Sequence, residues 1–304
     1  MNGVWATKHR PNSLTGIVGQ DNLVAELMSI VADNAPMQHY IFYSPEAGTG
    51  KTSVAHALAK DLGYQLIVFN ASSKKQRGIE FVEEHIIPMV QSGIQERIFL
   101  LDEADQLTDA AQSALKGVIE NASGYFILTC NRLPKVSRWL QSRCQVRTFE
   151  PISENDMTNR LIRVATLEGM FDSLNTGMIQ VIVDKHKGDL RNAIGALQTA
   201  CSLPTKERQR FIDSLTTPNM DYGRFLKLCF ADKNHEEAVK MMRGSVREQV
   251  RNVFTFAVEG VASPANKMRV VEAAIVSERD IINGVDEEIV RYNFIRLLIN
   301  GGHQ

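Results

Sequence analysis

The sequence predicts an α/β domain followed by parts that are entirely helical. In the first half, short apolar runs alternate with segments of helix length, whereas the patterns after Pro151 are helical only. Strands separated by helices favour right-handed βαβ crossovers and a parallel sheet that is covered on both faces. The change of pattern therefore predicts an α/β module, a small helical module and a helical C-terminal module.

The predicted strands are short and rich in Ile, Leu, Val, Phe and Tyr, which is typical of strands buried on both sheet faces. They cover residues 39–43, 65–70, 97–102, 125–130 and 146–149. The helical segments between them cover residues 52–62, 78–91 and 108–121. These elements predict a parallel sheet.

After Pro151, helices are predicted over 153–168, 176–186 and 189–201, and Ser153 with Asp156 can cap the first of them. The segment 203–220 carries two prolines and many polar residues, so it resembles a linker with at most one short helix. From Tyr222 onward the helical patterns cover 235–243, 246–261, 265–282 and 287–300.

The composition is that of an ordinary globular protein, with 304 residues, 44% of them hydrophobic and 23% charged. The 34 basic and 35 acidic residues give a formal net charge of -1. Proteins that coat themselves with nucleic acid are usually more basic, so a DNA contact must come from a local patch or from several subunits together. No apolar run reaches the roughly 18 residues of a membrane helix. No CxxC pair occurs, which argues against disulfides or structural zinc and predicts reduced thiols for Cys130, Cys144, Cys201 and Cys229.

The run SPEAGTGKTS at 44–53 follows the first predicted strand and opens a helix. Gly48 and Gly50 allow backbone N–H groups to point inward around a phosphate, which the positive end of the helix also attracts. Lys51 would reach the β- and γ-phosphates, and the Thr52 hydroxyl would coordinate Mg²⁺. The pattern predicts a nucleotide site, and the alternative is a glycine turn without a ligand.

Two carboxylates, Asp102 and Glu103, end the apolar strand predicted over 97–102. In P-loop proteins a carboxylate in this place helps to hold Mg²⁺, so we expect Asp102 beside the metal, while Glu103 can polarise an attacking water. Solvated carboxylates are common at strand ends, so the pair alone is a weak signal. Downstream of Lys51 and in this topology, it predicts hydrolysis rather than binding alone.

With these motifs the chain resembles an AAA+ ATPase and, within that class, a sliding-clamp loader of the replication factor C type. WATKHRP at 5–11 and IVGQ at 17–20 resemble the start of that family, with His9 in place of the usual tyrosine. Other matching motifs are NASS at 70–73, RGI at 77–79, LDEAD at 101–105, QSALKGVIE at 112–120, SRC at 142–144 and GDLR at 188–191. The matches cover residues 5–200. The run SPEAGTGKT at 44–52, with Pro45, is more similar to the large subunit of T4-type phage clamp loaders than to the GPPGTGKT of cellular members.

The resemblance implies the domain organisation of this family. A parallel five-stranded RecA-like AAA+ core would cover 1–150, and a small helical lid would cover 151–203. A linker over 204–220 would lead to a helical collar for oligomerisation over 221–304. The lid would rotate about the junction 149–151 as the nucleotide changes.

The resemblance also implies site residues at the matching positions. The adenine and ribose would be flanked by Ala6, Thr7, Lys8, His9 and Val18. The phosphates and Mg²⁺ would be held by Gly48, Thr49, Gly50, Lys51, Thr52 and Ser53, with Asp102 as a further metal ligand. The implied catalytic residues are Glu103, Asn131 as the sensor that orients the water, Arg191 as the lid sensor of the γ-phosphate, which also binds the nucleotide, and Arg143 as an arginine finger acting in trans.

Three of these residues have simpler alternatives. Asn131 fits a turn, Arg143 a surface ion pair, and Arg191 an ion pair on its helix. If Arg143 is a finger, hydrolysis should be slow until subunits assemble, because a missing finger costs about 10³–10⁵ in rate.

The DNA contacts implied by the resemblance are basic residues near two helices. Lys74, Lys75 and Arg77 precede one predicted helix, and Lys116 lies on the helix after the acidic strand. A short basic cluster is usually a solvated loop; as a DNA site it would contact the backbone and depend steeply on salt. The apolar residues of 81–90 fit either a clamp-docking face or the sheet-facing stripe of a helix.

The leading hypothesis is a DNA-replication hydrolase: an ATP- and Mg²⁺-dependent subunit of a hetero-oligomeric clamp loader. Its partners would be a sliding clamp, a small clamp-loader subunit, copies of itself in a ring and primer-template DNA, and no membrane. We expect a soluble protein of the cytoplasm, the host cytoplasm if a phage encodes it. The alternatives are another AAA+ motor, such as a branch-migration helicase with a C-terminal winged helix, and a nucleotide-holding scaffold that does not hydrolyse ATP.

Overall fold

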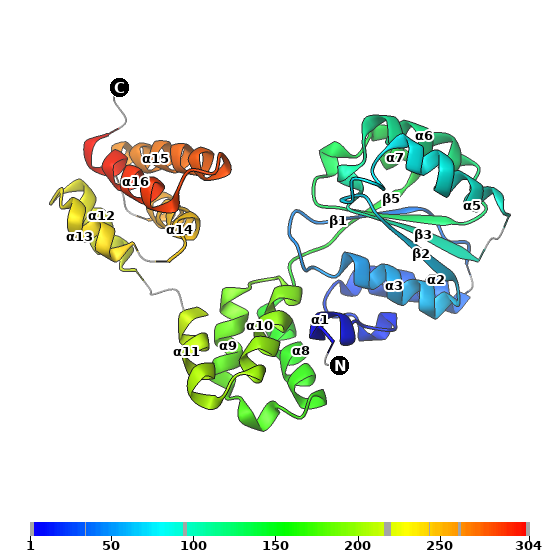
Figure 1. Cartoon of the computed structure of the whole chain (residues 1–304), viewed down its shortest axis with the longest axis horizontal. Helices are drawn as coiled ribbons and strands as arrows, with labels where there is room; N and C mark the ends of the chain where they lie inside the picture. The colour runs from blue at the N-terminus through cyan, green and yellow to red at the C-terminus, as the bar shows by residue number, and fades with distance from the viewer. Residues whose placement is uncertain are drawn as a thin grey trace. The chain divides into compact units, whose positions relative to one another are not determined.

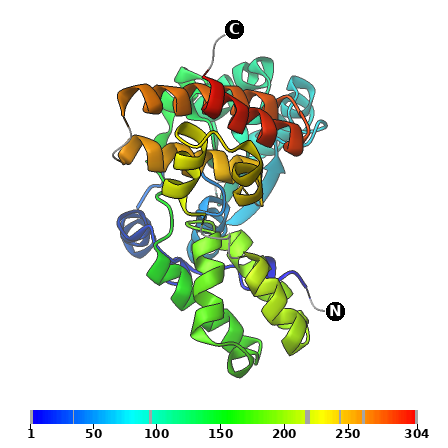
Figure 2. The same cartoon turned by 90° about the vertical axis from the view of Figure 1, so that its left-hand side faces the viewer.

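The computed structural model describes residues 3–33, 35–93, 96–215, 220–242, 244–260 and 263–301. The chain divides into two compact units, Met1–Asp213 and Ser214–Gln304. Figure 1 and Figure 2 show the helices and strands of each unit from two directions. No helix in the described part of the chain combines the length and apolarity needed to span a membrane.

A five-stranded parallel sheet forms the centre of the first unit, in the order β2-β3-β4-β1-β5. Its strands are β1 Tyr40–Tyr43, β2 Gln65–Asn70, β3 Arg97–Asp102, β4 Tyr125–Cys130 and β5 Gln145–Thr148. The predicted bounds of β2, β3 and β4 are confirmed. β1 begins one residue later than predicted and β5 lies one residue earlier, although the Gln145 N–H still donates to the His39 carbonyl at 2.7 Å.

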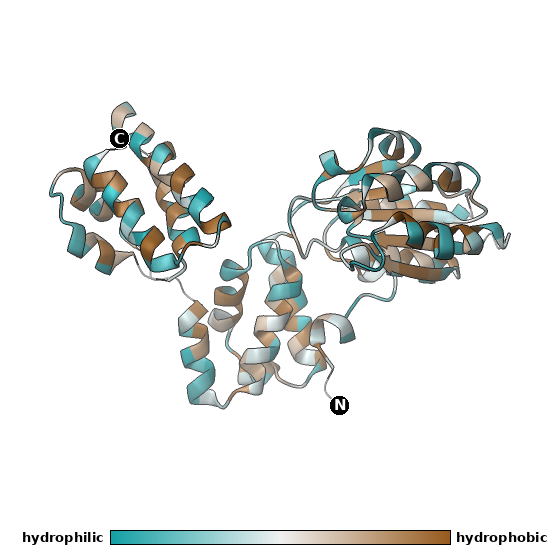
Figure 3. Cartoon of the chain, turned by 45° about the horizontal axis from the view of Figure 1, so that its top comes forward, coloured by the Kyte–Doolittle hydropathy of each residue, from teal (hydrophilic) through white to brown (hydrophobic). Residues whose placement is uncertain are grey.

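Each face of the sheet packs against its own set of helices, as a doubly covered parallel sheet requires. Phe99 and Leu101 of β3 point into one apolar cluster, and Ile98 and Leu100 into the other. Figure 1 shows α2 and α3 on one face and α5, α6 and α7 on the other. Much of the sheet is coloured as hydrophobic in Figure 3. These helices are α2 Asp21–Asp33, α3 Lys51–Leu62, α4 Ile79–Phe81, α5 Ile87–Gln91, α6 Asp109–Glu120 and α7 Arg138–Arg143.

The helix predicted over 78–91 is interrupted by a π-helical turn at Val82–Ile86. Pro88 follows this turn, and because proline lacks an N–H it cannot continue the regular α-helical ladder. Val82, Ile86 and Val90 are buried in the cluster on that face of the sheet. The apolar stripe of 81–90 is therefore the sheet-facing side of a helix.

The remaining helices of the first unit follow the sheet. They are α8 Glu154–Leu167, α9 Thr176–Lys185, α10 Leu190–Ser202 and α11 Thr205–Leu215. The predicted cap of α8 is confirmed, because the Ser153 hydroxyl accepts the Asp156 N–H at 3.1 Å. A short helix, α1 Trp5–Lys8, contacts α10, and Trp5 is buried.

The segment predicted as a linker contains the 11-residue helix α11. The buried side chain of Arg208 explains its order, because it donates to the carbonyl oxygens of Ser173, Ala200 and Leu203. Arg208, which would be expected at the surface from the sequence, thus attaches α11 to the neighbouring segments. Residues 216–219 of the predicted linker lie outside the described residues.

In the described part of the second unit, every element is a helix. The helices are α12 Tyr222–Phe230, α13 His235–Met241, α14 Val246–Glu259, α15 Pro264–Ile282 and α16 Glu287–Asn300. Phe225 and Phe294 lie fully buried in the shared core. The predicted last residues of α13 and α14, Arg243 and Val261, lie outside the described residues. The helical prediction for this region is otherwise confirmed to within a few residues.

An ion pair between α2 and β5 predicts a pH-dependent stability. Both carboxylate oxygens of Glu26 accept from Arg147, at 2.8 and 2.9 Å, and these hydrogen bonds hold the pKa of Glu26 below its usual value. A carboxyl group with a lowered pKa stabilises the fold at pH values above its unfolded-state pKa. That stabilisation is lost as the pH falls through its folded-state pKa. We expect Glu26→Gln to lower the melting temperature by about 1–3 °C near pH 7, and this difference to disappear as the pH falls through the lowered, folded-state pKa of Glu26. Thermal melts over a series of acidic pH values test this; a deficit that does not change with pH would contradict the electrostatic origin.

Candidate nucleotide site

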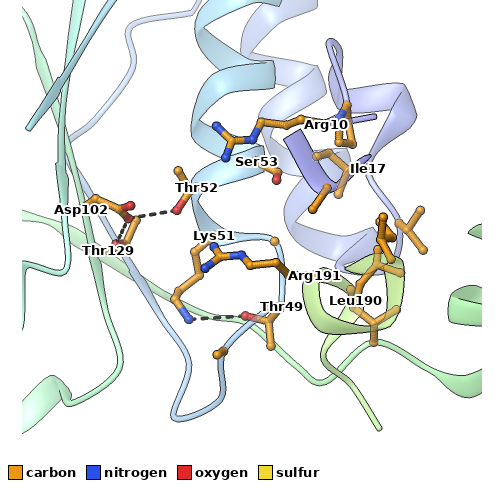
Figure 4. Close-up of a pocket in the computed structure, with 18 of the residues that line it drawn as sticks. Arg10, Ile17, Thr49, Lys51, Thr52, Ser53, Asp102, Thr129, Leu190 and Arg191 are labelled. Atoms are coloured by element: carbon orange, nitrogen blue, oxygen red, sulfur yellow. Dashed lines mark hydrogen bonds between the residues drawn. The ribbon is translucent and has the colours of Figure 1, made fainter. Parts of the chain in front are cut away.

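A pocket lies at the carboxyl ends of β1, β3 and β4, where open parallel sheets usually bind ligands. Part of its lining comes from the segment before α2, part from the loop after β1, and part from the start of α10 (Figure 4). The sequence-predicted residues that line it are Ala6, His9, Val18, Gly48, Thr49, Gly50, Lys51, Thr52, Ser53, Asp102, Glu103, Asn131 and Arg191. The structure thus brings together most of the predicted nucleotide site.

The loop after β1 takes its shape from two glycines. Gly48 and Gly50 have φ values of 72° and 97°, a region that favours glycine. Gly50 stands directly before α3, and its carbonyl accepts the Val54 N–H at 2.9 Å. The two glycines therefore allow the loop to place the N-terminal, positive end of α3 at the pocket, an arrangement suited to an anion such as a phosphate.

Lys51, the first residue of α3, lies over this loop. Its ammonium donates to the Glu46 carbonyl at 3.0 Å and has a longer contact of 3.5 Å with the Thr49 hydroxyl. Burial lowers the pKa of Lys51, and the nearby charge of Arg191 acts in the same direction, while Asp102 opposes the change. The Lys51 ammonium is thus partly desolvated and bound to a neutral carbonyl oxygen. A phosphate oxygen, which is charged, would be a stronger hydrogen-bond partner than that carbonyl.

Thr52 and Asp102 meet at the end of β3. The Thr52 hydroxyl donates to Asp102 Oδ1 at 2.9 Å, and the Thr129 hydroxyl donates to the same oxygen at 2.5 Å. A hydroxyl and one carboxylate are hard oxygen ligands, and Mg²⁺ is usually bound by few carboxylates together with substrate phosphates. Within the described residues, no group of three or more His, Cys, Asp or Glu could hold a metal by itself. The donor set therefore fits Mg²⁺ bound together with a nucleotide.

Glu103 follows Asp102 in a left-handed backbone conformation, with φ 58° and ψ 42°. This conformation is unfavourable for a residue with a side chain. The Glu103 N–H donates to the Thr129 hydroxyl at 3.0 Å, which helps to hold it. Thr129 thus orients both acidic residues, and only its polarity within an otherwise apolar strand could have indicated it from the sequence.

Arg191 lies at the start of α10 and extends toward the P-loop helix (Figure 4). The nearby carboxylate of Asp189 caps α10 instead, accepting the Asn192 N–H at 3.0 Å. Among the residues that the structure describes, Arg191 forms no ion pair, so the simpler alternative for it is not supported. Its guanidinium shares the pocket with the Lys51 ammonium.

The N-terminal segment forms the opposite wall and is attached to the helices after the sheet. His9 Nε2 and Lys8 Nζ both contact Glu168 Oε1, at 2.5 and 2.6 Å, and Arg160 donates to the His9 carbonyl. Arg160 also lines the pocket, whereas Lys8 and Thr7 do not. Sequence patterns could not reveal Arg160 or Glu168, since both meet the first ten residues only through the fold.

Asn131 lines the pocket just after β4, and its N–H donates to Asp105 Oδ1 at 3.3 Å.

Arg143 lies outside the pocket, where it forms an ion pair with Glu120 and lies over the Trp139 ring at 5.6 Å. A surface ion pair is thus present, as the simpler alternative predicts. The predicted DNA contacts also lie outside the pocket, and each is exposed: Lys74, Lys75, Arg77 and Lys116.

The P-loop lies close to Asp189, so alanine substitutions at Gly48 and Gly50 should differ in their effect on stability. A Cβ on Gly48 would lie 1.9 Å from Asp189 Oδ1 and 2.9 Å from the Asp189 Cα, whereas a Cβ on Gly50 meets nothing within 4 Å. Both positions carry the backbone cost of about 1–2 kcal/mol, and only Gly48 adds a collision. We expect Gly48→Ala to lower the melting temperature of the nucleotide-free protein more than Gly50→Ala does. Equal shifts would contradict the packing of Asp189 on this loop.

Comparisons with known proteins agree with this fold. A family model described as "ATPase family associated with various cellular activities (AAA)" matches residues 40–152. The replication factor C small subunit of Staphylothermus marinus is 37% identical over 209 residues, covering 66% of this chain and 62% of that protein. The corresponding protein of Halobacterium salinarum is 34% identical over 221 residues, covering 70% and 67%. The chain therefore belongs to the replication factor C family of AAA ATPases, and it spans 62% of the length of the first of these relatives.

A solved structure with a similar fold is the Thermotoga maritima RuvB Holliday junction branch migration motor. The TM-score is 0.57 with 17% sequence identity, and the match covers 84% of this chain and 89% of that one. At this identity the likeness shows the AAA+ fold alone.

Proposed function

We propose that this chain is an ATPase subunit of a DNA polymerase sliding-clamp loader. The observation that carries the proposal is the gathering of Lys51, Thr52, Asp102 and Arg191 in one pocket of a replication factor C family chain. ATP binding would allow the assembly to open the clamp and load it at primer-template DNA, and hydrolysis would release the clamp. A phage origin, and the role of large subunit beside a small clamp-loader subunit, stay predictions.

In this proposal the residues that line the pocket divide the chemistry among them. The P-loop N–H groups and Lys51 bind the β- and γ-phosphates, and Thr52 and Asp102 hold Mg²⁺. When bound there with the nucleotide, Mg²⁺ would supply positive charge beside the transferred phosphoryl group. Glu103 accepts a proton from the attacking water and Asn131 orients that water. The ribose and adenine lie against Ala6, His9 and Val18.

The position of Arg143 supports an active site shared between subunits, because this side chain does not reach the nucleotide pocket of its own chain. It is exposed and lies outside the pocket of its own chain, where it pairs with Glu120, lies over the Trp139 ring and makes two longer hydrogen bonds of 3.4 Å to the Trp139 carbonyl and the Ser142 hydroxyl. An exposed ion pair contributes little free energy, so a neighbouring triphosphate can replace Glu120 as its partner. In this proposal the finger enters the next subunit's site and stabilises the transition state there.

The second unit provides a surface for assembly. Met268, Ile275 and Ile282 repeat at seven-residue intervals along α15 and are 58%, 65% and 72% exposed. Three large apolar side chains on one helix face, open to water, are typical of a surface that packs against another protein. This supports the proposed collar over 221–304, after a core over 1–150, a lid over 151–203 and a linker over 204–220.

DNA contact is the part of the proposal that depends on charge. Lys74, Lys75 and Arg77 lie in the turn between β2 and α4, and Lys116 lies on α6. None forms an ion pair within the described residues, so all four can contact phosphates. Repeated around a ring, such contacts would follow the DNA backbone rather than its sequence.

The test is the ATPase rate of the chain together with its partner subunit, measured with and without primer-template DNA and clamp. We expect the two additions together to raise the rate well above that of the protein alone, and high salt to suppress the increase. A rate that ignores DNA and clamp would contradict the loader function. Strand exchange on branched DNA would favour a branch-migration motor instead, although the described part of the C-terminal unit contains helices only. Tight ATP binding without turnover would favour the non-hydrolysing scaffold.

A further inference from the structure

Gln20 has a backbone conformation that few residues with side chains adopt. Its φ is 61°, and Gly19 before it has a φ of 68°. Within the described residues, the other side-chain-bearing residues with positive φ are Glu103 and Lys233. Such a conformation costs about 1–2 kcal/mol in a free chain and persists only where the surrounding contacts favour it. The contacts of Gln20 therefore indicate what the conformation achieves.

The side-chain amide of Gln20 binds both backbone groups of Glu150. Nε2 donates to the Glu150 carbonyl at 2.7 Å, and the Glu150 N–H donates to Oε1 at 3.1 Å. The same Nε2 lies 3.5 Å from the carbonyl of Thr49 in the P-loop. The Gln20 amide thus satisfies the backbone N–H and carbonyl of Glu150, which a neighbouring strand would otherwise pair with. These contacts lie beside the phosphate-binding loop.

Glu150 stands at the junction between the sheet and the helices that follow it. Immediately before it, the Phe149 N–H donates to the Tyr43 carbonyl at 2.7 Å, which continues the pairing of β5 with β1. Immediately after it come Pro151 and Ile152, and α8 begins at Glu154. Gln20 therefore holds the chain where it leaves the sheet.

The junction contacts Gly188, in the segment that leads into Arg191. Ile152 pairs with Gly188 in an antiparallel bridge, and a Cβ on Gly188 would lie 2.9 Å from the Pro151 Cβ. Arg191 follows Gly188 by three residues, in the first turn of α10. A change in the direction of 150–152 must therefore move the start of α10 and the guanidinium that lines the pocket.

We propose that Gln20 is a positioning residue for Arg191. Its amide fixes the junction at Glu150 so that Arg191 lies at the phosphate end of the pocket, and it thereby sets how well the site distinguishes a nucleoside triphosphate from a diphosphate. The inference rests on the proposed nucleotide function and deepens it. Gln20 does not line the pocket itself, so in this proposal it acts on the triphosphate preference through Arg191.

The test is a double-mutant cycle of nucleotide affinity. Affinities for a non-hydrolysable ATP analogue and for ADP are measured for the full chain, for Gln20→Ala, for Arg191→Ala and for the double variant. We expect Gln20→Ala to reduce the preference for the triphosphate by about tenfold, with ADP affinity nearly unchanged. In the Arg191→Ala background, Gln20→Ala should change that preference no further.

Two further variants separate the amide from backbone strain. Gln20→Gly removes the amide but accepts the positive φ, so it should fold well and reproduce the loss of preference. Gln91→Ala, at an exposed position at the end of α5, is the matched control and should leave the preference unchanged. Hydrogen exchange should also show a faster-exchanging Glu150 N–H in Gln20→Gly.

The outcomes are distinguishable. Equal losses of ATP-analogue and ADP affinity, or losses that add to those of Arg191→Ala, would show a general structural role and overturn the proposal. An unchanged preference in Gln20→Gly would overturn it as well. A wild-type chain that binds neither nucleotide would contradict the proposed function itself, and the positioning role with it.

Discussion

Replacing Arg143 with alanine should reduce ATP turnover by the assembled protein by about 10³–10⁵, the effect of removing an arginine finger. ATP binding by the single chain should stay unchanged, because Arg143 lies outside the pocket of its own subunit. The physical reason is that the guanidinium stabilises charge in the transition state of a neighbouring site and contributes little to the ground state.

The matched control is Arg138→Ala, at an exposed position at the start of the same helix α7. It removes an equal charge at the other end of that helix, and we expect turnover to remain close to that of the wild type. Steady-state ATPase rates and nucleotide affinities of both variants provide the comparison. If Arg143→Ala turns over ATP at the wild-type rate in the assembly, Arg143 is only the surface partner of Glu120.

Glu103→Gln should abolish turnover and leave ATP binding intact. The substitution keeps the shape of the side chain but removes the carboxylate that accepts a proton from water. Its backbone contact with Thr129 does not involve the side chain, so the left-handed conformation next to Asp102 should persist. Single-turnover measurements with bound ATP test the loss of chemistry, and a separate binding assay tests the retained affinity.

Mixing the two inactive variants extends this prediction. Wherever a Glu103→Gln subunit donates its intact Arg143 to an Arg143→Ala subunit with an intact Glu103, one working site is restored. We therefore expect the mixture to regain part of the turnover that neither variant has alone. Variants that cannot restore each other would contradict a site shared between subunits.

The strands could be predicted because parallel strands buried on both faces leave a distinct signal. Phe99 and Leu101 face one helix layer and Ile98 and Leu100 the other, so the run has no polar alternation. Helix α11 could not be predicted with the same ease, because it is held in place by the buried contacts of Arg208 with three carbonyl oxygens. Side-chain contacts of this kind leave no periodic pattern in a sequence.

The same distinction applies to the site. Gly48, Lys51 and Thr52 could be predicted because a phosphate cradle needs these residue types at fixed short spacings. Contacts between distant segments could not, as Glu168 with His9 and Gln20 with Glu150 show. The sequence therefore indicates the chemical groups of the pocket, and the fold adds the side chains that orient them.

The central claim is that catalysis is completed by a group from an adjacent molecule. It is tested most directly by the hydrolysis rate per chain, measured across a range of protein concentrations while light scattering reports the assembly state. The account predicts negligible hydrolysis by the monomer and a rate that rises in step with the assembled fraction. A dilute monomer that hydrolyses ATP as fast as the assembled protein would contradict it.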